Sequence, residues 1–534
     1  MKPALKRDKS HRVLIQLALI LVGLLCVSSA VVAQTSPNPA APTAQQPKDE
    51  LWQTENLPAD AVFRYGSTER HPRAIGIYVL RFSADGKLIA FRDRRQSIRV
   101  LDLEKRRLLA TLPTQITADF LVSPDNKQLI VGNSKSVQVW NIADAKLERE
   151  FTAGGYRLAM SPEPHELVTV GKGVVNRYRW PLPSKPIVKR SKMANARAAG
   201  ISEDGKLAVF QDGRACEVLN TVDGSPISPA PRTVPKRALI SPNSNLLANI
   251  NYSNSSLRIF DLRNAMKHQF VLKDKRPFVT ATFSNDSRFL YSSHYDNAIV
   301  IWDMVTMKSV ARIRGHGSRV YALEADPNRL LCLASGAASP ADRTLIYWNF
   351  RDRLFPSIED EEDFTLDLVW DELGSDDAKI SLAATNRLYR AMQNDPTTVK
   401  ALTDRMGIDR VEDDSMALQL VDDLDNPKYD VREKATVTLK SMVDTIRPML
   451  ERRLGTSSQE AKWRINRILR TDRLRPEILT VSGRRGHRII VALELCGTAA
   501  AADALELVSK HSSNQNLVNL AKDAIRRSKD DPGE

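Results

Sequence analysis

The sequence predicts an all-β seven-bladed β-propeller followed by an all-α helical-repeat domain. Three observations lead to this prediction. Short β-like runs recur with a period close to 40 residues, the recurrence has seven copies, and an acidic run near residue 360 separates it from amphipathic segments. Repeats of this length are typical of propeller blades, because a single four-stranded sheet cannot cover both of its own faces.

Each copy is marked by a turn between its first two strands, usually with Ser followed by an acidic or amide residue. Asp, Asn and Gly accept the backbone of tight turns, and Ser or Asp side chains can hydrogen-bond the turn amides. Successive turns lie 38 to 43 residues apart. They begin at Ser83, Ser123, Ser161, Ser202, Ser241, Ser284 and Ala325.

The third strand of most copies ends in an aromatic or apolar residue followed by Asp or Asn, as in Trp302-Asp303 and Trp348-Asn349. Closing the ring requires an outer strand for the last blade, because an open sheet edge is a site of unwanted pairing. We expect the segment Ala61–Arg64 to supply that strand.

These residues resemble the WD40 repeat family over roughly residues 65–355. The last copy matches best, because Gly315-His316 opens it and Asp342 lies six residues before Trp348. The resemblance implies a hydrogen-bonded network of His316, Ser335, Asp342 and Trp348 inside this blade. It is nearly silent on the ligand, since the family is defined by structural residues.

The sixth copy keeps Asp296 six residues before Trp302, but Arg276-Pro277 stands near the place of Gly-His. The resemblance therefore implies that Asp296 and Trp302 belong to an incomplete network, with no histidine. His294 is expected in the polar loop before Asp296, in a solvated or structural role.

After the acidic run Glu359–Asp363, apolar residues recur at helical spacing. Ser375 is predicted to cap a helix that has Ile380 on its apolar side, and Ser457 is predicted to open a capping box. Later helices are predicted over 484–496, 499–510 and 514–527. Short loops between such helices suggest a HEAT-like stacked array, a tail that resembles those of bacterial WD40 proteins with a secretory signal.

The N-terminus carries a basic run and then an apolar stretch, which predicts a signal peptide over 1–33. A membrane anchor is the alternative, because the stretch approaches the ~20 residues that span a bilayer. The expected order continues with a disordered Pro/Ala-rich linker (34–60), the propeller (61–357) and the helical domain (358–534). We therefore expect an exported protein, either periplasmic or membrane-anchored with the propeller outside the cytoplasm.

No motif of an enzyme, a metal site or a cofactor site is found in the sequence. HExxH, CxxC, GxSxG and phosphate-binding loops are missing, so no catalytic residue, metal or cofactor is predicted. Cys216, Cys332 and Cys496 are too widely spaced for a disulfide framework, and we expect buried thiols or a single bonded pair. A propeller-channel enzyme or a carbohydrate-binding module stays as the alternative, because its residues would converge only in the folded channel.

The charge is distributed unevenly. Residues 51–357 hold 45 Lys and Arg against 28 Asp and Glu, a net +17, whereas residues 358–534 hold 27 against 33, a net −6. In a WD40-type propeller, the inter-blade loops and the loops after the second strands emerge on one face. A basic rim is therefore predicted there, comprising Arg92, Arg94, Arg95, Lys189, Arg190, Lys192, Lys236, Arg237, Lys273, Lys275, Arg276, Arg312 and Arg314.

Three interpretations of this rim stay open. It is a solvated charged surface, a binding face for an acidic protein or anionic envelope polymer, or a docking site for the chain's own acidic segments. Nucleic acid is disfavoured by the predicted export and by the lack of interleaved aromatic residues. The leading hypothesis is a non-enzymatic protein–protein interaction scaffold, exported, with the helical tail as a second interface to partners of unknown identity.

Overall fold

The computed structural model describes residues between 51 and 530, and the predicted signal or anchor (1–33) lies outside that range. So does most of the predicted linker. Within 51–530, the residues not described are 67–75, 94–96, 115–118, 154–155, 163, 183–184, 194–195, 213–215, 228–237, 252–255, 263–268, 340, 357–363, 407–414, 442–445, 447–448, 451–452, 473–480 and 513.

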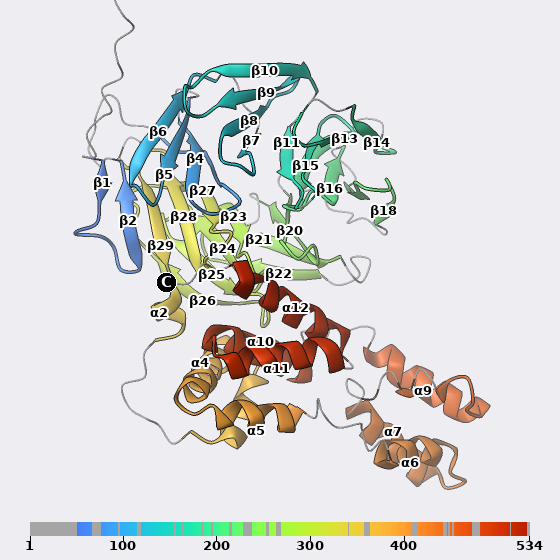
Figure 1. Cartoon of the computed structure of the whole chain (residues 1–534). Helices are drawn as coiled ribbons and strands as arrows, with labels where there is room; N and C mark the ends of the chain where they lie inside the picture. Colours follow the sequence, from blue (N-terminus) through green and yellow to red (C-terminus); the bar gives the residue numbers. More distant parts are fainter. Residues whose placement is uncertain are drawn as a thin grey trace, which may run out of the picture. The chain divides into compact units, whose positions relative to one another are not determined.

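Seven antiparallel sheets form the β part, and the first strands of neighbouring sheets contact one another around a common centre (Figure 1). The seven-bladed propeller predicted from the repeats is thus confirmed. Blades 1 to 3 consist of β3 (Val79–Phe82), β4 (Leu88–Arg92), β5 (Ile98–Asp102) and β6 (Arg107–Leu112); β7 (Asp119–Val122), β8 (Gln128–Gly132), β9 (Ser136–Asn141) and β10 (Leu147–Thr152); and β11 (Arg157–Met160), β12 (Glu166–Val170), β13 (Val174–Arg179) and β14 (Ile187–Arg190).

The remaining blades follow the same plan, with each strand hydrogen-bonded to the next one in the chain. Blades 4 to 7 consist of β15 (Arg197–Ile201), β16 (Leu207–Gln211), β17 (Cys216–Asn220) and β18 (Pro226–Ile227); β19 (Ala238–Ile240), β20 (Leu246–Asn251), β21 (Ser256–Asp261) and β22 (Gln269–Lys273); β23 (Phe278–Phe283), β24 (Phe289–His294), β25 (Ile299–Asp303) and β26 (Lys308–Ile313); and β27 (Val320–Ala325), β28 (Cys332–Ala337) and β29 (Leu345–Asn349).

The start of the folded part closes blade 7. β2 (Ala61–Tyr65) pairs antiparallel with β29, with Ala61 opposite Trp348, so the expected closing strand is confirmed. β1 (Trp52–Gln53) extends this sheet, although the sequence placed it in the linker. The Trp52 ring lies 4.8 Å from the Phe63 ring, and this aromatic contact explains why the folded part begins earlier than expected.

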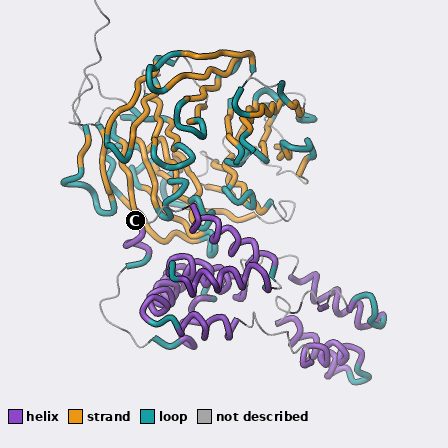
Figure 2. Tube along the Cα trace, in the orientation of Figure 1, coloured by secondary structure: helices purple, strands orange, loops and turns teal. Residues whose placement is uncertain are grey.

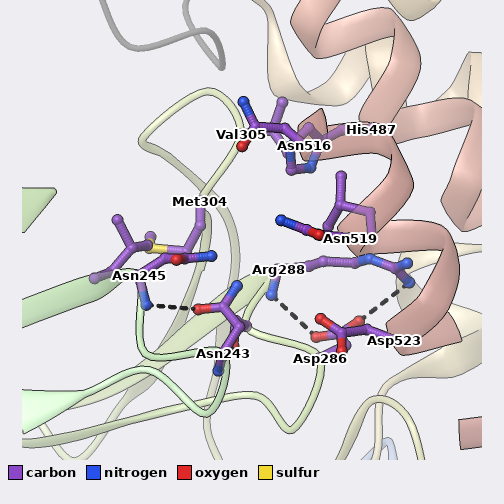
Figure 3. Close-up of a pocket in the computed structure, with 13 residues that line it drawn as sticks. Asn243, Asn245, Asp286, Arg288, Met304, Val305, His487, Asn516, Asn519 and Asp523 are labelled. Carbon is purple, nitrogen blue, oxygen red and sulfur yellow. Dashed lines mark hydrogen bonds and ion pairs between the residues drawn. The ribbon is translucent and has the colours of Figure 1, made fainter. Parts of the chain in front are cut away.

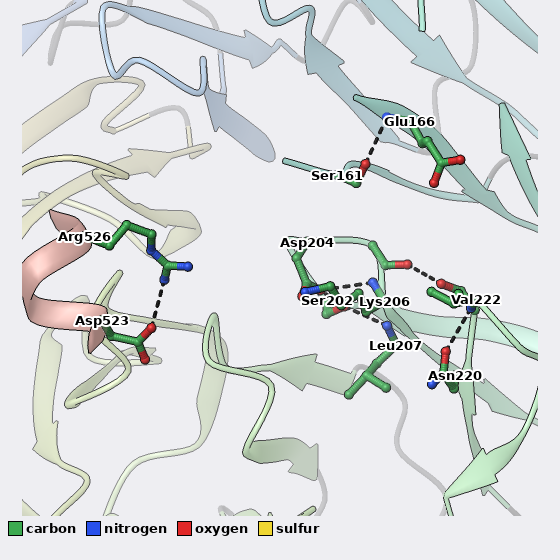
Figure 4. Close-up of polar contacts among 12 residues, drawn as sticks. Ser161, Glu166, Ser202, Asp204, Lys206, Leu207, Asn220, Val222, Asp523 and Arg526 are labelled. Carbon is green, nitrogen blue, oxygen red and sulfur yellow. Dashed lines mark hydrogen bonds and ion pairs between the residues drawn. The ribbon is translucent and has the colours of Figure 1, made fainter. Parts of the chain in front are cut away.

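The repeated turn has the predicted chemistry, as blade 4 shows (Figure 4). Ser202 Oγ donates to Asp204 Oδ1 over 2.7 Å and accepts from the Leu207 amide over 2.8 Å. The same carboxylate accepts from the Lys206 amide, which completes the turn. Gly205 takes a φ of +68°, a backbone conformation that L side chains rarely adopt and that glycine allows.

Helices follow the last blade, and strands and helices occupy separate stretches of the chain (Figure 2). One hydrophobic core joins several of these helices to side chains of blades 6 and 7, among them Tyr291 and Trp348. The helices of this group are α3 (Leu366–Leu373), α4 (Ala378–Asn394), α5 (Thr397–Met406), α10 (Val481–Cys496), α11 (Ala499–His511) and α12 (Gln515–Asp530), which follow the short α2 (Arg351–Leu354).

A second group has a core of its own, made by α6 (Ser415–Asp422), the 3₁₀ turn η1 (Asp423–Asp425), α7 (Tyr429–Ser441) and α9 (Gln459–Asp472). We call residues 415–472 the α6–α9 group. Leu439 and Ile465 lie in this core and are fully buried. The inserted group therefore does not depend on the propeller core for its own packing.

Two helix starts differ from the predictions. Asp377, not Ser375, caps α4 by accepting from the Lys379 and Ile380 amides, and this start leaves Ile380 47% exposed. Ser458, not Ser457, accepts from the Ala461 amide at the start of α9. In both cases several polar residues stand in a row, and the helix uses the last one before its first turn.

Candidate interaction surfaces

Blade 7 buries the polar network that its sequence implied. Trp348 Nε1 donates to Ser335 Oγ over 2.7 Å, and Ser335 Oγ lies 2.7 Å from His316 Nε2. His316 Nδ1 lies 2.9 Å from Asp342 Oδ2. Burial disfavours the Asp342 carboxylate, but hydrogen bonds from His316 and Thr344 hold its pKa below the usual range. This network stabilises the blade and has no open site for a ligand.

Blade 6 contains an equivalent chain, contrary to the expectation of an incomplete network. Trp302 Nε1 donates to Ser292 Oγ over 2.8 Å, and Ser292 Oγ lies 2.8 Å from His294 Nε2. His294 Nδ1 lies 3.1 Å from the Arg276 carbonyl oxygen. His294 is the last residue of β24 and fully buried, so it lies in a strand rather than in the expected loop, and of its two expected roles the structural one applies. Burial lowers its pKa, which fits a neutral imidazole that donates and accepts once each.

Asp296 does not join this network. Its Oδ2 accepts from Arg312 Nη2 and from Arg314 Nη2, both over 2.9 Å. Arg312 also donates to Asp274 over 3.0 Å. Two members of the predicted basic rim are therefore already paired with carboxylates of their own blade, which weakens their attraction for an external anion.

The remaining rim residues differ in placement and in exposure. Arg94, Arg95, Lys236 and Arg237 lie outside the described residues. Arg92, Lys189, Arg190 and Lys273 lie at or near the ends of strands rather than in loops, and the first two are half-buried. The exposed members that form no ion pair with a carboxylate in the described part of the chain are Arg190, Lys192, Lys273, Lys275 and Arg276.

We call those five exposed cations the basic face. Arg190 and Lys273 end the outer strands of blades 3 and 5, and the other three lie in the loops that lead to the next blade. They share one end of the propeller because every outer strand runs toward its inter-blade loop. Five residues of the predicted rim are therefore exposed at this end of the propeller, on blades 3 and 5 and the loops after them.

The centre of the propeller carries a charged cluster on three neighbouring first strands. Arg81 of β3 donates to Glu324 of β27 over 3.0 Å and to Asp119 of β7 over 3.2 Å. Both carboxylates raise the pKa of Arg81, and Asp119 also accepts from the Leu158 amide. Arg81 thus links three neighbouring blades at the centre of the propeller.

Buried ion pairs join blade 6 to the helices. Arg488 of α10 donates to Asp303 Oδ2 over 2.7 Å, and the two side chains are 1% and 0% exposed. Asp303 Oδ2 also accepts from the Thr306 amide, so it closes its own turn as well. Arg488 further donates to Ser381 of α4 over 3.1 Å. The acidic residue of Trp302-Asp303 is therefore an attachment point for the helical region.

A second pair reinforces this attachment. Glu494 of α10 accepts from Arg288 of the blade 6 turn over 2.6 Å and from Arg527 of α12 over 2.7 Å. Burial disfavours its charge, but the two cations lower the pKa of Glu494 to about 2. The acidic segments were one candidate to cover the basic rim, yet these ion pairs form at the opposite end of blade 6, where its two hairpin turns lie.

Beside these pairs lies a cavity of about 70 Å³ between blades 5 and 6 and helices α10 and α12 (Figure 3). Its lining combines apolar side chains, such as Met304 and Leu520, with charges of both signs, from Asp286, Arg288 and Asp523. The mixture of both charge signs gives no preference for an anion or a cation.

Three cysteines lie in the part of the chain that the structure describes. Cys216, Cys332 and Cys496 are buried free thiols, and burial raises the pKa of Cys216 to about 12. In the part of the chain that the structure describes, no group of three or more His, Cys, Asp or Glu side chains could hold a metal ion. Nor is any described helix long and apolar enough to cross a membrane.

The WD40 family (WD domain, G-beta repeat) matches residues 267–303 and 307–349. Each match begins near the outer strand of one blade and ends at the third strand of the next, so the repeats interlock neighbouring sheets. The chain therefore carries WD40 repeats, and such propellers typically serve as scaffolds for protein partners rather than as enzymes.

Two further comparisons found similar proteins. The chain is 29% identical over 111 residues to Protein FIZZY-RELATED 1 of Arabidopsis thaliana. This match covers 21% of this chain and 23% of that protein. It thus spans about a quarter of the length of this curated relative. Among solved structures, the β-propeller domain of Cps50 (Swd1) from Myceliophteria thermophila is similar, with a TM-score of 0.43, 16% identity, and coverage of 52% of this chain and 97% of that domain.

Proposed function

From WD40 repeats set in a seven-bladed propeller, we propose that this protein is a non-enzymatic interaction scaffold. The basic face binds an acidic segment of a protein partner, and the helical region supplies a second interface. The observation that carries the proposal is the basic face itself, five exposed cations at the end of the propeller opposite the blade 6 turns that bind the helices.

The chemistry of the face fits a partner held by several weak contacts. Exposed ion pairs contribute ~0.2–1 kcal/mol each, so affinity must come from their sum and from other contacts around them. Clustered charges also speed association, and salt weakens both effects. Such a face suits an acidic protein segment; an anionic envelope polymer is the competing ligand.

A charge-matched pair of variants tests the proposal. The test variant changes Lys273, Lys275 and Arg276 to Ser, and the control changes Lys87, Lys127 and Lys206 to Ser. These three control lysines lie in the first turns of blades 1, 2 and 4, at the other end of the propeller, and are exposed. Both variants lose three positive charges, so net charge cannot explain a difference between them.

We expect partner retention from the protein's own cell extract to fall roughly 3- to 100-fold in the test variant only, because three exposed contacts contribute ~0.6–3 kcal/mol. Raising the salt should release the partner from wild type. Equal retention by wild type and the test variant would contradict the proposed face. Retention that persists after protease treatment of the extract would identify a polymer instead of a protein.

We also propose that the protein is exported, on the strength of the basic and apolar N-terminal segment. Mass spectrometry of the purified native protein distinguishes a cleaved signal peptide from a retained membrane anchor. A mature chain that starts at Gln34 indicates release after cleavage, and a chain that retains residues 1–33 in the membrane fraction indicates anchoring. A full-length chain in the cytoplasmic fraction would contradict export.

A further inference from the structure

Arg319 is an exposed cation at the same end of the propeller as the basic face. It lies in the loop that leads to β27 of blade 7, just as Lys275 and Arg276 lie in the loop that leads to β23 of blade 6. Its guanidinium lies 4.0 Å from the centre of the Tyr295 ring, which is 46% exposed. A guanidinium stacks on a ring through its flat face, so its N–H groups still point outward in their own plane. Within the described residues, no carboxylate pairs with Arg319.

Backbone contacts join the Tyr295–Arg319 stack to the basic face. The Tyr295 amide donates to the Pro277 carbonyl oxygen over 3.1 Å. The preceding carbonyl oxygen, of Arg276, lies 3.1 Å from Nδ1 of His294, the residue before Tyr295. Because Arg276 is a member of the basic face, the stack extends that face from blade 6 to blade 7.

The charge of these loops is unbalanced. Their two carboxylates, Asp274 and Asp296, accept from Arg312, and Asp296 accepts from Arg314 as well. The cations that have no carboxylate partner among the described residues are Lys273, Lys275, Arg276 and Arg319. This excess of positive charge favours a negatively charged partner at this place.

Two further tyrosines lie beside Arg319 at the centre of the propeller. Tyr321 follows Arg319 by two residues, and Val320 between them is buried, so the two outer side chains leave the strand on the same side. The Tyr321 ring centre lies 5.6 Å from that of Tyr78, which precedes β3 of blade 1 and is 36% exposed. The pairing of β27 with β28 shifts at Tyr321, a bulge of the kind that re-aims a side chain. We call Tyr78, Tyr295, Arg319 and Tyr321 the tyrosine–arginine patch.

We propose that the tyrosine–arginine patch selects the acidic segment that the basic face binds. A carboxylate of that segment pairs with the in-plane N–H groups of Arg319, and an aromatic side chain close to it packs on Tyr78 and Tyr321. Exposed Tyr and Arg in one place are the composition of binding hot spots. The inference rests on the proposed function, and it adds the chemical class of the partner segment, which is Asp or Glu next to an aromatic residue.

Three synthetic peptides test this chemistry on the full-length chain. The probe is a fluorescein-labelled Gly/Ser peptide that carries several Glu around one Phe; one twin has Lys in place of every Glu, and the other has Ser in place of Phe. We expect fluorescence anisotropy to show binding of the probe at least tenfold tighter than of the Lys twin and at least threefold tighter than of the Ser twin. Equal binding of the probe and the Ser twin would overturn the inference alone. Equal binding of the probe and the Lys twin, or no binding of any peptide, would overturn the proposed function as well.

Arg319→Lys tests the carboxylate contact. It keeps the charge but removes the planar guanidinium, so binding of the probe should weaken at least threefold. The matched control is Arg149→Lys in the exposed outer strand β10 of blade 2, which should leave binding unchanged. Unaltered binding by Arg319→Lys, or an equal loss in Arg149→Lys, would overturn the inference.

Tyr78→Ser tests the aromatic contact. It should weaken binding of the probe at least threefold and leave binding of the Ser twin unchanged, because the twin has no ring to pack. Tyr429→Ser is the control, since Tyr429 of α7 is 62% exposed and far from blade 1 in the chain, and it should keep the preference for Phe. If Tyr78→Ser lowers the melting temperature, Tyr78→Gln, of closer size, must show the same selective loss. A loss that is equal for the probe and the Ser twin would contradict the aromatic contact.

The two surfaces can fail separately. The Lys273/Lys275/Arg276 variant should bind both the probe and the Ser twin more weakly and still prefer the probe. If this variant loses affinity while Arg319→Lys and Tyr78→Ser bind like wild type, the tyrosine–arginine patch is overturned and the basic face stands. If all three variants bind like wild type, both are overturned.

Discussion

Blades 6 and 7 perform the same internal task with different residues. Both bury a chain from a Trp indole through a Ser hydroxyl to a His ring, with Ser292 and Ser335 on the second strand of their blades. In blade 7 the ring arrives from the loop before the first strand, as His316, and in blade 6 from the end of the second strand, as His294. The network depends on where the imidazole lies in space and not on its place in the repeat.

The two blades differ in the residue after the tryptophan. Asp303 is charged and buried and binds Arg488 of α10. Asn349 is exposed, and its Oδ1 accepts from the Arg351 amide at the start of α2 over 2.9 Å. Both blades pack apolar side chains against the helices in the shared core, and blade 6 adds buried ion pairs to this packing.

The largest effect is expected from Arg488→Met. It leaves the Asp303 carboxylate buried without its cation, which should lower the free energy of unfolding by ~3–5 kcal/mol in a urea titration. Asn349→Ala is the control in blade 7 and should cost ~0.5–1.5 kcal/mol, because one hydrogen bond is lost. The double variant Asp303→Asn, Arg488→Met should recover part of the loss. Equal losses of stability in Arg488→Met and Asn349→Ala would mean that the buried ion pair contributes no more than one exposed hydrogen bond.

The next largest effect is expected when acid neutralises the Glu494 carboxylate, which binds Arg288 of blade 6. The pKa of Glu494 is lowered to about 2, so its ionised form stabilises the fold fully above the unfolded pKa near 4.5. This contribution, at most ~3 kcal/mol at ~1.4 kcal/mol for each unit of pKa, is lost as the pH falls from about 5 toward 2. Glu494→Gln should be less stable at pH 7 and should lose less stability on acidification. A variant curve parallel to wild type would show that other carboxylates account for the acid sensitivity.

Matched serine variants compare the two internal networks. Ser292→Ala and Ser335→Ala each leave an indole N–H and a histidine without their shared partner, which should cost ~1–3 kcal/mol in either blade. Thermal unfolding monitored by Trp fluorescence measures both losses. A markedly smaller loss for Ser292→Ala would mean that the network of blade 6 contributes little, in spite of its geometry.

The sequence predicted the repeated part of the molecule and missed its exceptions. Seven turns with a common Ser-x-Asp chemistry determine seven blades, because each turn is a local structure. His294 was misplaced because a resemblance compares positions along the chain, and an imidazole that enters a blade by another route leaves no signal at the expected position. The role of Arg488 was also missed, since its partner Asp303 is 185 residues away and looks like an ordinary repeat residue.

For the candidate surfaces too, the sequence revealed the composition but not the contacts that form in the folded protein. The basic rim was predicted from composition and loop position, but the pairing of Arg312 and Arg314 with Asp274 and Asp296 depends on how neighbouring loops meet in the folded blade. The exposure of Tyr429, Val437 and Trp463 left no signal because these residues occur in helices whose other apolar residues form a core. Only packing shows which apolar positions remain exposed.

The smallest effect is expected at Asp296, and it sharpens the comparison most directly. Asp296 and Asp342 both lie six residues before the blade tryptophan, yet Asp342 is buried against His316 and Asp296 accepts from two exposed arginines. Asp296→Asn should therefore change the free energy of unfolding by only ~0–1 kcal/mol, with less effect in high salt. Asp342→Asn should cost ~1–3 kcal/mol, because it replaces a charged acceptor inside a buried network. Denaturant titrations of both variants decide the matter: comparable losses would mean that Asp296 supports its blade after all, through the arginines that anchor the end of β26.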